Sequence, residues 1–132
     1  MNYKIYIKKD RKTNKIVADF IRNSLSEYKK RLSRFCKIET IYYTGLIKAE
    51  GYKILVSNAG NSVTSEKLAL NINKLGVSGV SNVCFFFDDN SGDFDSNICI
   101  SKMDMSPDLL GLILYEQIYR GYKILGGETY HH

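Results

Sequence analysis

The sequence predicts an α/β fold in which a mostly parallel sheet carries flanking helices, and three observations lead to this prediction. Segments that alternate apolar and polar residues, as strands do, are separated by segments with helical periodicity. Residues 80–87 (VSNVCFFF) form a continuous apolar run, which is typical of a strand buried on both faces of a parallel sheet. The 132 residues suit one domain, residues 1–132, without repeats or linkers.

The first half of the chain is predicted to hold three strands and one long helix. A strand is expected over residues 3–9, where Tyr3, Ile5 and Ile7 alternate with the residues between them. A helix follows over about residues 14–32, with helical spacing between the apolar residues Ile16, Phe20, Leu25, Tyr28 and Leu32. Residues 36–44 and 52–60 alternate again and are predicted to be the second and third strands.

The second half is predicted to add two helices and two strands. A helix is expected over about residues 65–75, with Thr64 or Ser65 as its N-cap. The buried strand at residues 80–87 is followed by an acidic loop, DDNSGDFD, and by a short strand at residues 97–101. That loop lacks the spacing and the final glutamate of a calcium-binding loop, so an acidic surface loop and no metal site is the better interpretation.

The last helix has clear start and stop signals. Ser106 is a favourable N-cap, Pro107 fits the first helical position, and Gly126 and Gly127 end the helix. Its apolar residues wrap most of the helix surface: Leu109, Leu110, Leu112, Ile113, Leu114, Tyr115, Ile118 and Tyr119. A helix that is apolar all round needs cover on several sides. In so small a protein, we expect a second subunit to supply part of that cover.

Charge is distributed unevenly along the chain. The formal net charge is +5, but residues 1–50 carry 13 Lys and Arg against 5 Asp and Glu, whereas residues 51–132 carry 6 against 9. The basic half contains two clusters, residues 8–15 and 28–37. A concentrated basic face is typical of a nucleic-acid-binding protein, although a solvated surface gives the same pattern. We interpret the two clusters as candidates for phosphate contacts.

The cysteine pattern and hydropathy favour a cytoplasmic protein without a membrane segment. The three cysteines, Cys36, Cys84 and Cys99, form no C-x-x-C pair and are predicted to be reduced core residues. No apolar run approaches the ~20 residues that span a bilayer, and the N-terminus does not resemble a signal peptide.

The C-terminal segment LYEQIYRGYKILGGETYHH (114–132), with ISKMDM (100–105) upstream, is similar to the ribosomal RNA large subunit methyltransferase H family. That family of small SPOUT-class enzymes reads S-K-M-T-F-P-H-Q, E-Q-I-Y-R-A and G-E-P-Y-H-K in this region. The earlier part agrees in order, with a SEYKKRL helix, an I-L-x-x-x-x-G strand and S-E-x-L-A. The resemblance therefore covers nearly the whole chain, more weakly in its first half.

The resemblance implies a C-terminal deep trefoil knot, a homodimer, and S-adenosylmethionine (SAM) bound in the knot. It implies an rRNA or ribosome partner and methylation of N3 of a pseudouridine in a large-subunit rRNA hairpin. The family's C-terminal tail reaches the active site at the dimer interface, which makes Tyr130, His131 and Arg120 the catalytic candidates here. The cofactor positions carried over from the family are Val56, Asp88, Ile100, Ser101, Lys102, Met103, Asp104 and Met105.

The chain departs from the family pattern at several of these places. Asp88 and Asp89 stand where the family has loop glycines, Ser106–Pro107 where it has Pro-His, and Gly111 where it has an arginine. Residues 45–51 and 88–97 are short where the family has helices. These departures favour an alternative: a catalytically silent SPOUT paralogue that acts as a dimeric RNA- or protein-binding module. A cofactor pocket beside Asp88 would favour the enzyme.

Overall fold

The computed structural model describes residues 1–9, 15–45, 47–87 and 93–127, which contain one five-stranded sheet. In chain order the elements are β1 (Asn2–Lys8), α1 (Lys15–Leu32), β2 (Lys37–Tyr43), β3 (Tyr52–Ser62), α2 (Ser65–Val77), β4 (Asn82–Phe86), β5 (Ser96–Cys99) and α3 (Pro107–Leu125). The strands lie in the order β2-β1-β4-β3-β5, and all four neighbouring pairs are parallel. The predicted α/β fold with a parallel sheet is confirmed, with boundaries that agree to within a few residues.

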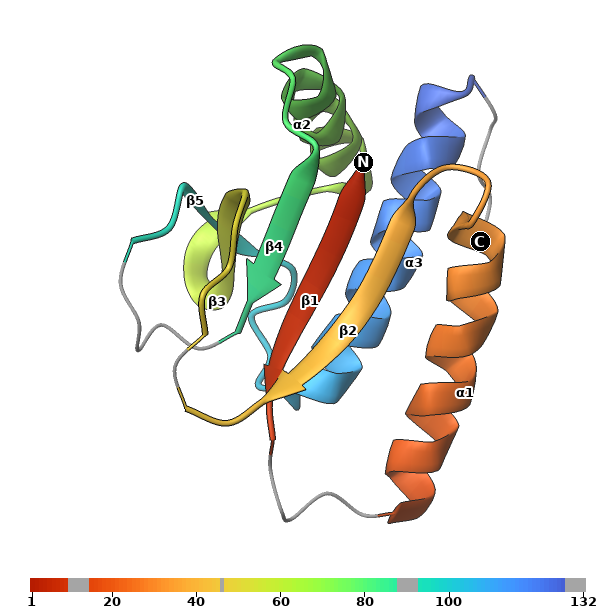
Figure 1. The fold of residues 1–132 in the computed structure, drawn as a ribbon, viewed down its shortest axis with the longest axis vertical. Helices are drawn as coiled ribbons and strands as arrows, with labels where there is room; N and C mark the ends of the chain where they lie inside the picture. The colour runs from red at the N-terminus through yellow and green to blue at the C-terminus, as the bar shows by residue number, and fades with distance from the viewer. Residues whose placement is uncertain (10–14, 46, 88–92, 128–132) are drawn as a thin grey trace.

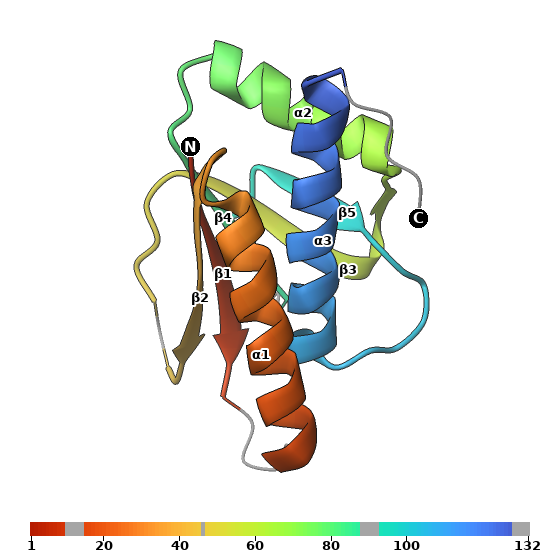
Figure 2. The ribbon, with the colours of Figure 1, turned by 90° about the vertical axis from the view of Figure 1, so that its right-hand side faces the viewer.

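All three helices pack on one face of the sheet. Helices α1 and α3 run along this face, and α2 crosses its end near the amino ends of β1 and β4 (Figures 1 and 2). The main core lies between the helices and this face. Its fully buried side chains include Tyr3, Ile5, Ile7, Val83 and Phe85 from the sheet and Leu32, Leu114, Tyr115 and Ile118 from the helices.

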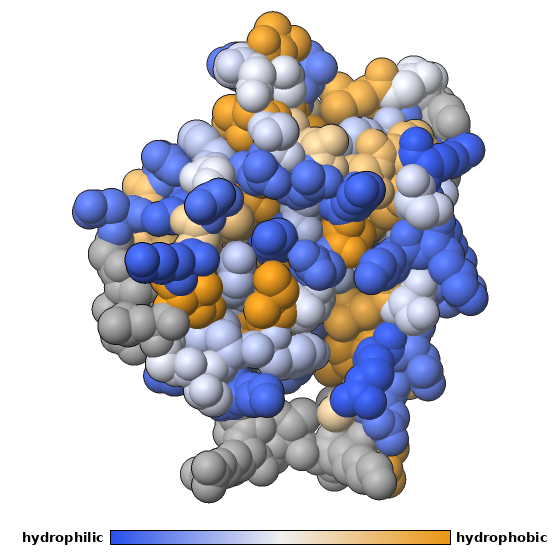
Figure 3. Space-filling model, in the orientation of Figure 1, coloured by the Kyte–Doolittle hydropathy of each residue, from blue (hydrophilic) through white to orange (hydrophobic). Residues whose placement is uncertain are grey.

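The opposite face of the sheet has no helix over it in the described ranges. Residues 44–51, which connect β2 to β3, contribute Ile47 and Ala49 to a small second core around Tyr6, Leu55, Cys84 and Phe86. Parallel sheets are ordinarily covered on both faces. The space-filling view shows hydrophilic side chains across much of this face (Figure 3). The short connections noted in the sequence therefore open one side of the sheet.

Strand β4 is buried on both faces, as its apolar run predicts. Val83 and Phe85 face the main core, Cys84 and Phe86 face the small core, and all four are at most 6% exposed. All three cysteines are buried free thiols.

Helix α1 is present, but two of its predicted core residues are not in the core. Ile21, Leu25 and Leu32 are buried, whereas Ile16 is 79% exposed and Phe20 is 68% exposed. The prediction was wrong for these two because they lie on the outer side of the helix. Spacing alone does not show which of two apolar stripes meets the sheet.

Helix α3 begins as the sequence predicts. The Ser106 hydroxyl accepts a hydrogen bond from the Leu109 amide at 3.3 Å, and Pro107 occupies the first turn. Its inner face, with Leu114, Tyr115 and Ile118, is covered by this chain's own sheet and helices. Leu109 remains 39% exposed on the other side. None of the described helices is long and apolar enough to cross a membrane.

Candidate active site

The carboxyl ends of β3, β4 and β5 lie side by side, and the candidate cofactor residues follow them. Val56 in β3 is 3% exposed and pairs with Ile98 in β5. Ile100 follows β5 directly, and Phe87 follows β4. In open parallel sheets, ligands bind in the crevice outside the carboxyl ends of the strands. The structure therefore brings Val56 together with the segment that begins at Ile100.

The β5–α3 loop, residues 100–105, is tied to β3 by one side-chain contact. The Asn58 amide donates to the Asp104 carboxylate at 2.9 Å. Within the loop, the Met103 backbone amide donates to the Ser101 hydroxyl at 3.1 Å. Met103 is 70% exposed, which places a large apolar side chain in solvent beside the strand ends. Lys102 and Asp104 are exposed as well.

Strand β3 carries an irregularity beside this loop that sequence reasoning missed. Ile98 of β5 pairs with both Val56 and Asn61, so residues 57–60 bulge out of the ladder. A Cβ on Gly60 would lie 2.5 Å from the Ile98 carbonyl carbon, so only glycine allows this close approach. Bulges are frequent next to active sites because they redirect side chains. The glycine at the end of the predicted strand was the available signal.

Arg120 does not join this group of residues within one chain. It lies on α3, where its guanidinium donates to the Glu116 carboxylate at 2.7 Å and to the Ser65 hydroxyl at 3.4 Å. Thirteen residues separate it from Pro107, so it lies about 20 Å along the helix from the β5–α3 loop. Ser65 also donates to Gln117 at 2.7 Å, which fixes the start of α2 against α3.

Three candidate residues lie outside the described residues. They are Asp88 in the loop after β4 and Tyr130 and His131 at the C-terminus. Their roles, and the expectation about a pocket beside Asp88, remain predictions. Among the residues that the structure places, no group of three or more His, Cys, Asp or Glu could hold a metal ion.

Two tyrosines at the contact between β2 and α3, Tyr42 and Tyr115, are unsuited to act as a general base. Burial and the neighbouring Asp108 carboxylate raise the pKa of Tyr42 to about 12, and its hydroxyl donates to Asp108 at 3.0 Å. Burial also raises the pKa of Tyr115, whose hydroxyl lies 2.9 Å from that of Thr40. Both phenols therefore stay protonated near neutral pH and can donate but not abstract a proton.

Gly111, where the resembling family has an arginine, has a packing role here. It lies on the buried side of α3, and a Cβ there would be 3.2 Å from Cδ1 of Ile7. A longer side chain at this position would push α3 away from β1. The position therefore faces the sheet and offers no side chain to a ligand.

The residues at the strand ends suit a nucleoside cofactor. Ile100 and Met103 offer apolar surface for an adenine ring next to the buried Val56, and the loop backbone offers hydrogen bonds that do not depend on side-chain identity. Lys102 offers a cation for a carboxylate. The donor set is therefore compatible with SAM. Two cavities in the described part of the structure are not lined by the β5–α3 loop: one under α2 at the β3–β5 edge, which includes Ile98, and one beside the C-terminal end of α1.

Comparison with known proteins defines the class. A family model described as "Predicted SPOUT methyltransferase" matches residues 43–131, about two thirds of the chain. This range includes the strand ends, the β5–α3 loop and α3. The parallel sheet and its loops thus belong to a SPOUT-class methyltransferase.

Curated relatives narrow the class further. The chain is 37% identical to "Ribosomal RNA large subunit methyltransferase H 1" of Thermoanaerobacter sp. (strain X514) over 137 residues, 99% of both chains. It is 32% identical to "Ribosomal RNA large subunit methyltransferase H" of Clostridioides difficile (strain 630) over 149 residues, 89% of this chain and 94% of the relative. The chain therefore belongs to the ribosomal RNA large subunit methyltransferase H family of SPOUT methyltransferases.

The alignment lengths support the shortening inferred from the sequence. An alignment of 149 positions exceeds this chain's 132 residues, so the Clostridioides relative has segments that this chain lacks. The alignment with the Thermoanaerobacter relative has 137 positions, so that relative has fewer residues without a counterpart in this chain.

Proposed function

We propose that the protein is a SAM-dependent methyltransferase that methylates N3 of a pseudouridine in large-subunit rRNA. The observation that carries the proposal is that β3 pairs with β5 through Val56 and Ile98 and holds the following loop, residues 100–105, through Asn58 and Asp104, in a chain of this family. SAM, when bound, supplies an electrophilic methyl group. The chain's own residues hold the cofactor and the base, and remove the N3 proton. The proposed setting is cytoplasmic.

The proposed roles follow from the chemistry of each residue. Ile100 and Met103, supported by the buried Val56, would hold the adenine, the backbone of residues 101–105 would supply hydrogen bonds, and Lys102 would pair with the cofactor carboxylate. Asp104 keeps the loop on β3 through Asn58. Tyr130 and His131 orient the target base or accept its proton. Asp88, as a carboxylate, would favour the cationic sulfonium if it lined the cofactor site.

The proposed site is shared between two chains. Arg120 lies about 20 Å along α3 from the β5–α3 loop of the same chain. Two copies of α3 packed antiparallel about a two-fold axis would place the end of one helix beside the start of the other. Arg120, Tyr130 and His131 of one subunit would then complete the cofactor site of the other.

The outer face of α3 is the proposed contact surface of this homodimer. Leu109 is 39% exposed, and Leu112 and Ile113 are only half-buried by their own chain. A C-terminal trefoil knot around the β5–α3 loop is part of the same proposal. The strand order and the family membership support it.

A calorimetric titration with SAM tests the cofactor part of this proposal. We expect micromolar binding, close to −8 kcal/mol, by the wild-type protein. Met103→Glu should weaken it at least about tenfold, because a carboxylate would replace apolar surface and repel the cofactor carboxylate. Leu70→Glu, a matched change at a 62% exposed leucine on α2, should bind like wild type. Absence of binding at millimolar SAM would instead favour the catalytically silent alternative.

A further inference from the structure

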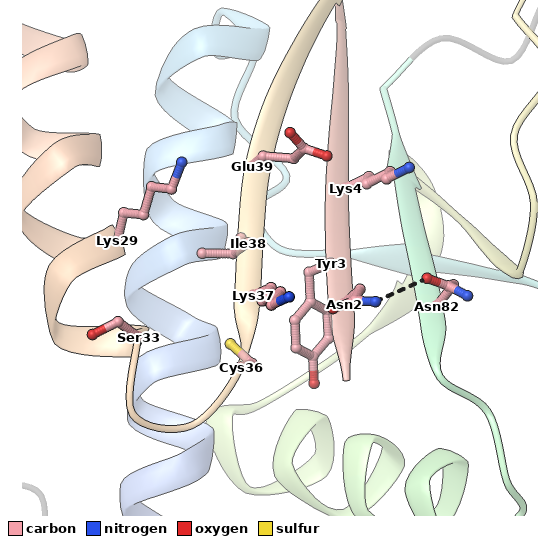
Figure 4. Close-up of a pocket in the computed structure, with 10 residues that line it drawn as sticks. All are labelled: Asn2, Tyr3, Lys4, Lys29, Ser33, Cys36, Lys37, Ile38, Glu39 and Asn82. Atoms are coloured by element: carbon pink, nitrogen blue, oxygen red, sulfur yellow. Dashed lines mark hydrogen bonds between the residues drawn. The ribbon is translucent and has the colours of Figure 1, made fainter.

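A cavity of about 590 Å³ lies where the end of α1 meets the amino ends of β1, β2 and β4. Figure 4 shows Lys29 on α1 and Ser33 just after its end, Lys4 on β1 and Asn82 on β4. Its lining residues are Asn2, Tyr3, Lys4, Lys29, Ser33, Cys36, Lys37, Ile38, Glu39 and Asn82. The basic cluster at residues 28–37 supplies part of this lining, and Lys4 joins it only through the fold.

The cavity is electropositive. Three lysines, Lys4, Lys29 and Lys37, line it against one carboxylate, Glu39. The chain's amino terminus is close as well. Burial raises the pKa of the Cys36 thiol to about 11, and the positive N-terminal ammonium partly opposes that shift. Charges held beside a wall of low dielectric constant attract anions more strongly than charges in open solvent.

The remaining lining groups suit a phosphate ester. Tyr3 and Ile38 form an apolar wall, at 1% and 3% exposure. The side-chain amides of Asn2 and Asn82, 3.4 Å apart, and the Ser33 hydroxyl offer neutral hydrogen-bonding groups at the rim. Lysine ammonium groups act as mobile point charges, which match the spread negative charge of a phosphodiester.

The position of the cavity connects it to the proposed catalytic tail. The hydroxyl of Tyr3, in the cavity wall, lies 2.8 Å from the hydroxyl of Tyr122 near the end of α3. Phe35, next to Cys36, stacks on Tyr122 with ring centroids 5.2 Å apart. The cavity therefore lies under the last turns of the helix that leads to Tyr130 and His131.

We propose that this cavity binds a phosphate of the substrate RNA backbone and anchors the RNA near the last turns of α3. The inference rests on the proposed function, because it takes RNA as the substrate. Charge complementarity selects a polyanion, and the spread of the lining lysines over α1, β1 and β2 favours an extended phosphate chain. Phosphate contacts of this kind fix the position of the nucleic acid and do not read its sequence.

The test compares RNA binding by two double variants. Lys29→Gln with Lys37→Gln removes two exposed lining charges, and Lys67→Gln with Lys74→Gln removes two exposed charges from α2 as the matched control. A short fluorescein-labelled RNA hairpin is titrated by anisotropy over a range of salt concentrations. We expect the cavity variant to bind about tenfold more weakly and to lower the log–log salt slope by roughly one to two. The control variant should stay close to wild type.

Equal losses in both variants would overturn the inference, because they would show general attraction between a basic protein and RNA. Failure of the wild-type protein to bind the hairpin at low salt would overturn it as well. The SAM titration separates this inference from the proposed function. If SAM binds and the rRNA is methylated while the cavity variant behaves like the control, the phosphate site is refuted and the proposed function is not. If only the cavity variant loses RNA affinity and SAM does not bind, the phosphate site is supported and the methyltransferase proposal is refuted.

Discussion

Three glycines, Gly51, Gly60 and Gly111, allow the closest approaches to neighbouring atoms among the described glycines. The caps of α2 and α3 were predictable, since the signals for Thr64 and Ser106 are local. The tight contacts of Gly51, Gly60 and Gly111 were not predictable, because each neighbour comes from a distant part of the chain. Gly60 is the clearest case, since it lets residues 57–60 approach β5 beside the candidate cofactor loop.

Two glycine-to-alanine changes should act in opposite directions on stability. A Cβ on Gly121 would meet Ala69 of α2 at 3.6–3.8 Å, an ordinary contact, within a helix that disfavours glycine. Gly121→Ala should therefore raise the free energy of unfolding by about 0.5–1 kcal/mol.

Gly51→Ala should lower the free energy of unfolding by about 1–3 kcal/mol. Its φ of +117° strains any L side chain, and the new Cβ would lie 2.4 Å from the Asn82 carbonyl oxygen. Urea denaturation of both variants measures the two effects. A stable Gly51→Ala, or a destabilised Gly121→Ala, would show that the packing around these two positions has been misjudged.

At the scale of elements, periodicity identified each helix and strand but did not fully assign the faces. The burial of strand β4 was predictable, because an uninterrupted apolar run is buried on both faces and neither face has to be assigned to solvent. Helix α1 has two apolar stripes, and only the stripe containing Ile21 and Leu25 meets the sheet. Helix α3 was predicted to need outside cover, but Leu114, at the middle of its apolar run, is fully buried within one chain. A charge at Leu114 would therefore unfold the monomer and report nothing about a dimer.

Leu109 is the position that tests the proposed dimer. Leu109→Glu places a charge on the exposed face of α3 and favours the positive end of the helix dipole, so the fold should survive. We expect the variant to elute as a monomer in size-exclusion chromatography with light scattering. Leu70→Glu on α2 is the control and should remain dimeric. A Leu109→Glu dimer as tight as wild type would place the interface elsewhere.

At the scale of the whole molecule, the strand order and the one-sided helical layer decide where function can lie. The class of fold follows from alternating helices and strands, but the order β2-β1-β4-β3-β5 depends on long-range pairing that no local pattern encodes. Of the predicted site, Val56 and residues 100–105 meet at one end of the sheet. Arg120 lies far along α3 and does not join them within one chain.

Methyl transfer from labelled SAM to large-subunit rRNA tests this shared-site enzyme most directly when two defective variants are co-expressed. Arg120→Ala should disable the part of the site that follows α3, and Met103→Glu the cofactor part. Each alone should be inactive. Random assembly gives mixed dimers with one intact site, so the account predicts about a quarter of wild-type activity for the pair. A wild-type protein that transfers no methyl group, or a co-expressed pair no more active than either variant alone, would contradict it.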